Sequence, residues 1–435
     1  MEQRRKNLTQ LFIPICLETL LYMLSGMVDT LMLSSVNDQA VGAVGTANTY
    51  IGIFIIMFSV ISSGMVAVMT QNIGAGRPGV AYQARQLGLA FNAVLGVIMS
   101  LFLSLGAGTI LSGVGVADAL MQPAKTYLQI VGGFCILNAL IPICSSYLRA
   151  FGFSKEPLYA SIIGNVINFC LNAFFLFVLH KGVAGVATAT VISRIINLVI
   201  VVLLGAVLVK AKQHPERESN RAVMGQIIRI GLPSACETAI YNVSMTLVIR
   251  FLNQMDAQGL NVTARSYTMQ ITNFSYCVGA ALAQANAIMT GWHIGAKEYD
   301  ACDRGTKKAA VIGVIVAVIL ETVFTLCSGW IMQLFSKDPQ MVSLVGKLLA
   351  IDIVLEIGRV TNLVYGQALK TSGDAVFPVV MGACFMILCS VGGTYLFGIR
   401  LGLLAVGAYI GMAGDECVRA IGPLEERKVE RKGIG

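Results

Sequence analysis

The chain has 435 residues, of which 56% are hydrophobic and only 12% are charged. Soluble globular domains carry about 25% charged residues, so this composition excludes an ordinary soluble protein and places the chain in a lipid bilayer. The formal net charge of +8 does not indicate a nucleic-acid partner, because the basic residues lie in short loops and do not form one patch.

Apolar stretches recur along the whole chain. Each is about 20 residues long, the length that a helix needs to cross the hydrocarbon layer of a membrane. The pattern predicts twelve spans, six in each half. In chain order they cover residues 11–33, 48–71, 87–109, 126–148, 157–179, 183–209, 227–252, 266–291, 307–329, 343–369, 376–397 and 401–421.

The two halves repeat each other in register, as they do in transporters built from parallel repeats. We therefore predict an all-α membrane protein whose twelve transmembrane helices form two pseudo-symmetric six-helix lobes. The lobes comprise residues 1–212 and 213–435, with a linker at about 210–225. The repeat is seen in three matched pairs: Pro14 with Pro233, Glu18 with Glu237, and Arg149 with Lys370.

Lys and Arg residues indicate the orientation, because cytoplasmic loops retain positive charge. Counting from the N-terminus, the basic residues gather in every second connection. The linker is the richest of these, with Lys210, Lys212, Arg217, Arg221 and Arg229 in or beside it. Both termini and the linker are predicted to be cytoplasmic, in a multi-pass protein of the cell membrane.

Asp29 lies late in the first span, with no basic residue within a helical turn along the chain. Ionisable residues inside a span cost about 2.5 to 3.5 kcal/mol and usually face the bundle interior or a water-filled cavity. An unpaired carboxylate there could exchange a proton or coordinate a sodium ion. A position close enough to the outer interface to stay hydrated would also explain it.

The fifth span holds Asn165, Asn168 and Asn172, whose spacings of three and four align them on one helix face. These amides could bind Asp29, an ion, a water chain or a substrate. Hydrogen bonding between helices, which polar residues commonly provide in membrane bundles, is an equal alternative. Tyr127, at the start of the fourth span, could cap the cluster.

The second half contains more intramembrane charges. Asp352, Glu356 and Arg359 share one face of the tenth span. A structural ion pair between Glu356 and Arg359 is the leading interpretation, and a charge relay that leaves Asp352 unpaired is the alternative. Glu237 could couple an ion, although its repeat mate Glu18 suggests a structural role at least as well.

We assign no transport role to two further groups of charged residues. Glu321 lies in the ninth span with no sequence neighbour to pair with, and we assign it no role. Asp415 and Glu416, together with Arg419, are expected to mark the inner end of the last helix.

Catalytic and cofactor functions find no support in the sequence. The 11 Cys residues and three His residues form no zinc or disulfide pattern. There is no P-loop lysine, and the glycines at 74–79 follow a membrane helix and not a strand. We expect neither an enzyme nor a resident metal or cofactor, and only a coupling H⁺ or Na⁺.

Several short motifs, weak alone but specific in their order, resemble those of the multidrug and toxic compound extrusion (MATE) transporters. The likeness covers nearly the whole chain. The motifs are Pro14 with Met27-Val28-Asp29-Thr30, residues 71–76 (QNIGAG), residues 147–152 (YLRAFG) with Pro157, Asn168, residues 182–187 (GVAGVA), and Pro233 with Glu237.

The resemblance implies twelve helices in two lobes that open to one side, and export of cationic or amphipathic organic compounds against inward flow of H⁺ or Na⁺. It suggests Asp29 as the coupling acid of the first lobe and Glu237 as a candidate cation-site residue of the second. Asp352 and Glu356 are further candidates. A lipid-linked oligosaccharide flippase, which shares this architecture, is the alternative, although its pyrophosphate would require several unpaired cationic residues.

The chain departs from the family pattern at two positions. Asn172 stands where many relatives carry a second aspartate, and Arg359 stands where sodium-coupled members often carry one. Together these departures favour H⁺ over Na⁺. The tail after Gly422 also lacks the Arg-Trp ending of the family.

We expect the protein to be a monomer whose partners are the lipid bilayer and small organic substrates.

Overall fold

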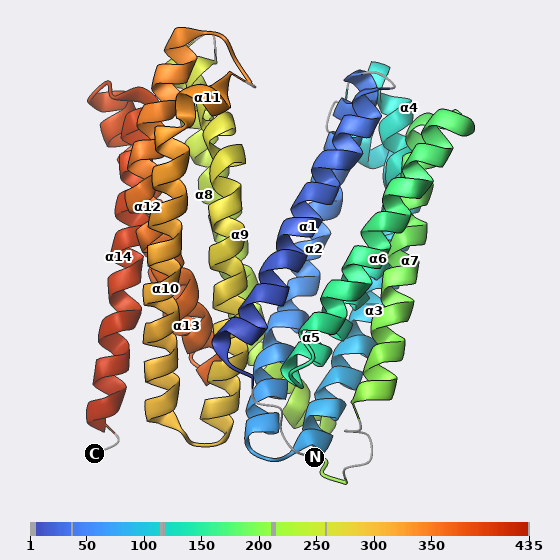
Figure 1. Ribbon diagram of the computed structural model, residues 1–435, viewed down its shortest axis with the longest axis vertical. Coiled ribbons are helices and arrows are strands. Elements are labelled where there is room, and N and C mark those ends of the chain that lie inside the picture. The colour runs from blue at the N-terminus through green and yellow to red at the C-terminus, as the bar shows by residue number, and fades with distance from the viewer. Residues whose placement is uncertain are drawn as a thin grey trace. The chain divides into compact units, whose positions relative to one another are not determined.

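The fold is helical throughout the part of the chain that the structure describes. The computed structural model describes residues 6–35, 38–113, 116, 118–209, 215–256, 259–333 and 335–433, with the backbone alone at 38, 119 and 423–433. Part of the expected linker and the side chains of the tail therefore lie outside the described residues. The chain divides into two compact units, Met1–Leu232 and Pro233–Gly435, and within each the long helices run side by side (Figure 1).

The first unit is built from six apolar segments, each of which coincides with a predicted span. Its core lies where α2, α3, α5 and α7 pack together around buried side chains such as Phe58, Leu103 and Leu128. The elements are α1 (Leu8–Ser34), α2 (Asp38–Gly74), α3 (Pro78–Gly113), α4 (Asp118–Tyr127), η1 (Leu128–Gly132), α5 (Ile136–Ala150), α6 (Lys155–Ala173), η2 (Phe174–Val178) and α7 (Gly182–Leu208).

The fourth span is not the single straight helix that the sequence predicts. It consists of α4, the π-helical turn η1 and α5, and residues Leu120–Gly132 and Ile136–Ala150 meet at an angle of 43°. The break falls at Gly132 and Gly133, where glycine offers no side-chain packing to stiffen the helix. The bend places Tyr127 just before the π-helical turn and not at the beginning of a continuous span.

The second unit contains the remainder of α8 (Asn220–Met255), whose first turns belong to the first unit. Helix α8 begins within the segment that the sequence assigns to the linker. The core lies among α8, α9, α12 and α14, around Val248, Leu348 and Leu355. The further elements are α9 (Leu260–Gly295), α10 (Tyr299–Leu326), α11 (Ser328–Met332), α12 (Pro339–Ser372), α13 (Val376–Phe385), η4 (Met386–Val391), η5 (Thr394–Arg400) and α14 (Leu404–Gly433).

Helix α12 carries the central charges of this unit, and local signals define both of its ends. Asp338 caps the N-terminus by accepting a hydrogen bond from the backbone N–H of Gln340 at 3.0 Å, with Pro339 in the first turn. Gly373 ends the helix in the left-handed conformation, with a φ of 110°. In between, a Cβ added at Gly358 would meet the backbone N of Cys417 at 2.6 Å, so the bare glycine allows α12 and α14 to approach closely.

The two units differ in how apolar their helices are. Among the described residues, seven helices are individually long and apolar enough to cross a membrane, and the bent pair α4–α5 is an eighth candidate. All six spans of the first unit are in this set, but only α10 and the α13–η5 segment of the second unit are. Helices α8, α9, α12 and α14 coincide with predicted spans and are long enough, yet they contain more polar residues.

Candidate functional site

Helices α1 and α6 of the first unit bring Asp29 against the asparagines that the sequence singles out. The side-chain amide of Asn172 donates hydrogen bonds to Oδ1 of Asp29 at 2.6 Å and to Oδ1 of Asn168 at 3.2 Å. Asn172 is fully buried and Asn168 is 5% exposed, whereas Asp29 is half-buried. The carboxylate therefore lies at the edge of a polar cluster whose interior consists of amides.

The side-chain oxygen of Asn172 is unusual in its hydrogen bonding. Oδ1 of Asn172 is buried and has no hydrogen-bond partner among the described residues. A buried polar atom without a partner costs free energy, and such atoms are rare in folded proteins. The carbonyl of Asn172 is thus an acceptor available to any donor that appears beside Asp29.

The other two residues predicted for this site lie near it without joining the hydrogen-bond chain. Asn165, one turn earlier on α6, is half-buried and makes no hydrogen bond within the described ranges. Tyr127 is 5% exposed and lies within electrostatic range of Asp29. The structure therefore brings Asp29, Asn168, Asn172 and Tyr127 together and leaves Asn165 at the margin.

Arg194 of α7 is the residue that sequence reasoning overlooks at this site. It acts electrostatically on both Asp29 and Tyr127. In the described part of the chain, no Lys or Arg nitrogen lies within 4.0 Å of a carboxylate oxygen of Asp29, which is the limit for an ion pair. Arg194 is visible in the sequence as a charge inside the sixth span, but its proximity depends on the packing of α7 against α1, which no local pattern encodes.

The duplicated acids Glu18 and Glu237 form equivalent contacts in the two units. In the first, Arg149 Nη2 lies 2.5 Å from Glu18 Oε2, and in the second, Lys370 pairs with Glu237. These side chains are 10–17% exposed. We call these two contacts the repeat ion pairs. The sequence matched both partners of each pair by register without indicating that they touch.

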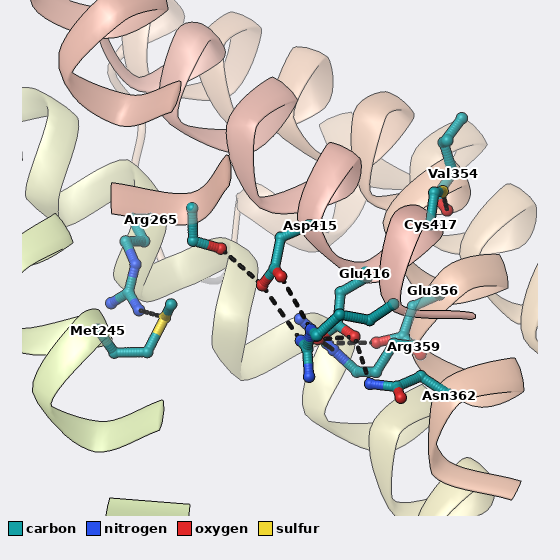
Figure 2. Close-up of polar contacts among 11 residues, drawn as sticks. Met245, Arg265, Val354, Glu356, Arg359, Asn362, Asp415, Glu416 and Cys417 are labelled. Atoms are coloured by element: carbon teal, nitrogen blue, oxygen red, sulfur yellow. Dashed lines mark hydrogen bonds and ion pairs between the residues drawn. The ribbon is translucent and has the colours of Figure 1, made fainter. Parts of the chain in front are cut away.

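The second unit contains a larger network of charges between α12 and α14 (Figure 2). Arg359 pairs with Glu356 on its own helix and lies 3.6 Å from Glu416 Oε1 on α14. Arg419 binds Glu416 at 2.9 Å and Asp415 at 2.8 Å. The pair between Glu356 and Arg359 that the sequence suggests is therefore one part of a longer chain of alternating charges.

Two neutral side chains complete this network. Ser390 of η4 donates a hydrogen bond to Asp415 at 2.8 Å, and Asn362 of α12 donates one to Glu416 at 3.1 Å. The expectation that Asp415, Glu416 and Arg419 mark the inner end of the last helix is wrong. Helix α14 continues to Gly433, and the three residues are at most 6% exposed. Their spacing of three and four residues within an apolar span was the available signal.

Asp352 and Glu321 lie beside this network without belonging to it. Asp352 is 2% exposed and Glu321 is fully buried. Asp352 and Glu356 both act electrostatically on Glu321, so the structure brings α10 and α12 acids into one region. Glu237 makes its ion pair with Lys370, outside the network, and also acts electrostatically on Arg419.

Comparison with known proteins gives a consistent result. The family model described as MatE matches residues 14–174 and 233–396. The uncharacterized transporter YisQ of Bacillus subtilis is 33% identical over 414 residues, which cover 94% of this chain and 90% of that protein. The probable multidrug resistance protein NorM of Thermotoga maritima is 23% identical, covering 96% of this chain and 90% of that protein.

Solved structures extend the likeness to the fold. A crystal structure of a MATE protein in its straight conformation has a TM-score of 0.88 with this chain at 20% sequence identity, covering 97% of this chain and 95% of that one. At this identity the likeness concerns the fold alone. It confirms the all-α membrane fold with twelve helices that the sequence predicts.

Proposed function

The chain belongs to the MATE family of membrane transporters, which are not enzymes, and on that premise we propose that it is a proton-coupled antiporter that exports cationic or amphipathic organic compounds. The observation that carries the proposal is the contact between the half-buried carboxylate of Asp29 and the fully buried amide of Asn172. Relatives such as the NorM protein of Thermotoga maritima, named a probable multidrug resistance protein, support the substrate class.

An amide can serve a carboxyl group in both of its protonation states. A carboxylate only accepts hydrogen bonds, and Asn172 donates one to it at 2.6 Å. A protonated carboxyl group also donates, and the buried Oδ1 of Asn172 has no partner in the described structure. Rotation of the Asn172 amide would present this acceptor to the protonated form, so the same side chain can hydrogen-bond Asp29 in either protonation state.

Coupling requires that the substrate bind the two protonation states with different affinity. An ionised Asp29 adds negative charge that attracts an organic cation, and protonation removes it. Proton entry would therefore weaken substrate binding and favour release. Asp352, Glu356 and Glu237 remain candidates for a further coupling role, but Glu356 and Glu237 each have a cationic partner.

The flippase alternative receives less support from the charges of the second unit. The pyrophosphate of a lipid-linked sugar calls for unpaired arginines or lysines. Arg359 and Arg419 each contact carboxylates on α14, and Lys370 is paired with Glu237.

We further propose that the protein is a monomer in the cell membrane and that both of its termini are cytoplasmic. An epitope attached to either terminus should then be accessible only after cells are permeabilised.

Transport in proteoliposomes tests the coupling ion directly. With purified protein, an imposed pH gradient should drive movement of a fluorescent organic cation, and a Na⁺ gradient alone should not. Asp29→Asn should insert and fold but lose the pH-driven movement. Asp118→Asn, the same change at an exposed position in the first turn of α4, serves as the matched control. Movement driven by Na⁺ alone, or full activity of Asp29→Asn, would contradict the proposal.

A further inference from the structure

Arg265 of α9 is a buried cation to which the proposed antiport gives no role. It is 7% exposed and lies beside the apolar core of the second unit, to which its neighbour Ala264 and Tyr409 of α14 belong. Moving a guanidinium group out of water costs free energy unless a carboxylate or another anion compensates its charge. A buried arginine such as Arg265 is therefore expected to have an anionic partner.

Two other arginines that are buried to a similar degree do have such partners. Arg149 is 8% exposed and lies 2.5 Å from Glu18, and Arg419 is 4% exposed and lies 2.8 Å from Asp415. In contrast, no carboxylate oxygen of the described residues lies within 4.0 Å of a nitrogen of Arg265. Arg265 thus has the burial of these two arginines without their compensation.

The hydrogen bonding of the Arg265 guanidinium is also incomplete. Its Nη2 donates to the thioether sulfur of Met245 on α8 at 3.7 Å, and a thioether is a weak acceptor. Its Nε is buried and has no hydrogen-bond partner within the described chain. Figure 2 joins Arg265 to Met245 and to none of the carboxylates that it draws. Because a guanidinium carries five N–H donors in a planar fork that suits a carboxylate, this one has donors left for an anion.

Two acids of the same unit could have supplied the missing charge, and neither does. Asp256 precedes α9 and accepts a hydrogen bond from the backbone N–H of Leu260 at 2.9 Å, so it caps the start of the helix. Asp352 of α12 acts electrostatically on Tyr409, as Arg265 does, yet in the described structure it forms no ion pair with Arg265. The compensating anion is therefore expected to come from outside the chain.

The matching position of the first unit carries no cation. Residues 73–75 (IGA) at the end of α2 match residues 294–296 (IGA) at the end of α9, and this register places Val44 opposite Arg265. Val44 is partly buried and packs against the apolar core of the first unit. The shared architecture of the two halves therefore does not require an arginine at this position, which favours a function particular to the second unit.

We propose that Arg265 is an anion-binding residue of the second unit, and that its ligand is a small monovalent anion that accepts hydrogen bonds from the guanidinium. Two sources could supply this ligand, namely chloride from solution or the carboxylate of a zwitterionic exported compound. The second source would extend the exported compounds from cations to zwitterions. For that role the inference rests on the proposed antiport, whereas anion binding itself can be measured without transport.

Chloride binding to the purified protein tests the first source. At constant ionic strength, replacing gluconate by chloride should raise the unfolding temperature of the wild-type protein in a saturable manner. Arg265→Gln should weaken chloride binding about 10- to 100-fold, because a hydrogen bond to a charged group is lost. Arg265→Lys, which keeps the positive charge, should retain the response. Arg250→Gln, the same change at an exposed arginine of α8, should behave as the wild type does.

A matched pair of dyes tests the second source. Fluorescence polarisation compares the binding of a rhodamine that has a free carboxylate with the binding of its ethyl ester, which is cationic. If an exported compound supplies the anion, the wild-type protein should bind the zwitterionic dye more tightly than the ester. Arg265→Gln should lose this preference, and Arg250→Gln should keep it.

The outcomes separate the anion site from the proposed antiport. Either response supports the site if it depends on Arg265, and which dye or ion responds identifies the source. The site is overturned if the wild-type protein shows neither response, or if Arg265→Gln retains the response that the wild type shows. Arg265→Met, which keeps the apolar packing of the side-chain stem, replaces Arg265→Gln if the latter does not fold. If the anion binds through Arg265 but a pH gradient drives no organic cation, the site stands and the proposed transport function fails.

Discussion

The same family model matches residues in both units, yet the two units accommodate their polar groups in opposite ways. Every predicted span of the first unit is apolar enough to cross a membrane alone or as part of a bent pair, and its acid Asp29 has amides as hydrogen-bond partners. In the second unit, α12 and α14 join acids to arginines in a continuous network. A carboxylate beside amides can change its charge at little structural cost, whereas one that balances two arginines cannot. The first arrangement suits coupling, and the second suits stability.

The largest predicted effect is the loss of thermal stability on removing Arg419. The matched removal of Arg194 from the first unit tests the contrast between the units directly. Arg419→Met leaves Asp415 buried without a cation and Glu416 with Arg359 alone, and breaking a buried pair costs about 3 to 5 kcal/mol. Arg194→Met removes a charge that pairs with no carboxylate within 4.0 Å in the described structure, so the loss should be much smaller. Thermal unfolding in detergent measures both. Equal losses of thermal stability in the two variants would contradict the proposed difference between the units.

The repeat ion pairs should come next in size. Glu18→Gln and Glu237→Gln each remove the carboxylate that pairs with a partly buried cation, and we expect a loss of about 1 to 3 kcal/mol from each. The swapped variant Glu237→Lys with Lys370→Glu should recover much of the stability and of the transport activity, because the ion pair is restored in reverse. Recovery of stability without transport would identify Glu237 as a coupling residue and not merely a structural one.

The smallest predicted effect concerns the amide beside Asp29. Asn172→Ala removes the 2.6 Å hydrogen bond to the carboxylate, and a hydrogen bond to a charged group contributes about 1.5 to 3 kcal/mol. We expect roughly tenfold slower pH-driven transport and a loss of thermal stability no larger than that contribution. Asn172→Gln, which keeps the amide, should be less impaired. A variant that unfolds early while transporting normally would show that the amides only hold α1 to α6.

The sequence predicted the spans well because hydrophobic length is a local property. It also placed Asp29, Asn168 and Asn172 on faces that could meet, since the spacing of the asparagines is readable on one helix. The sequence did not reveal the network around Glu416, because Arg359 and Glu416 belong to different helices, whose packing includes the close approach at Gly358. The bend before α5 likewise depends on a π-helical turn that no apolar pattern reveals.

The repeat ion pairs also have a consequence for how the protein is made. Glu18 and Arg149 are separated by 131 residues, so the carboxylate enters the membrane long before its partner exists. At synthesis rates of about 5 to 20 residues per second, Arg149 follows roughly 7 to 26 s later. For that time the first helix must remain near the membrane surface or be sheltered by the insertion machinery. The second unit repeats this delay between Glu237 and Lys370, so each half of the chain is completed by a late-arriving cation.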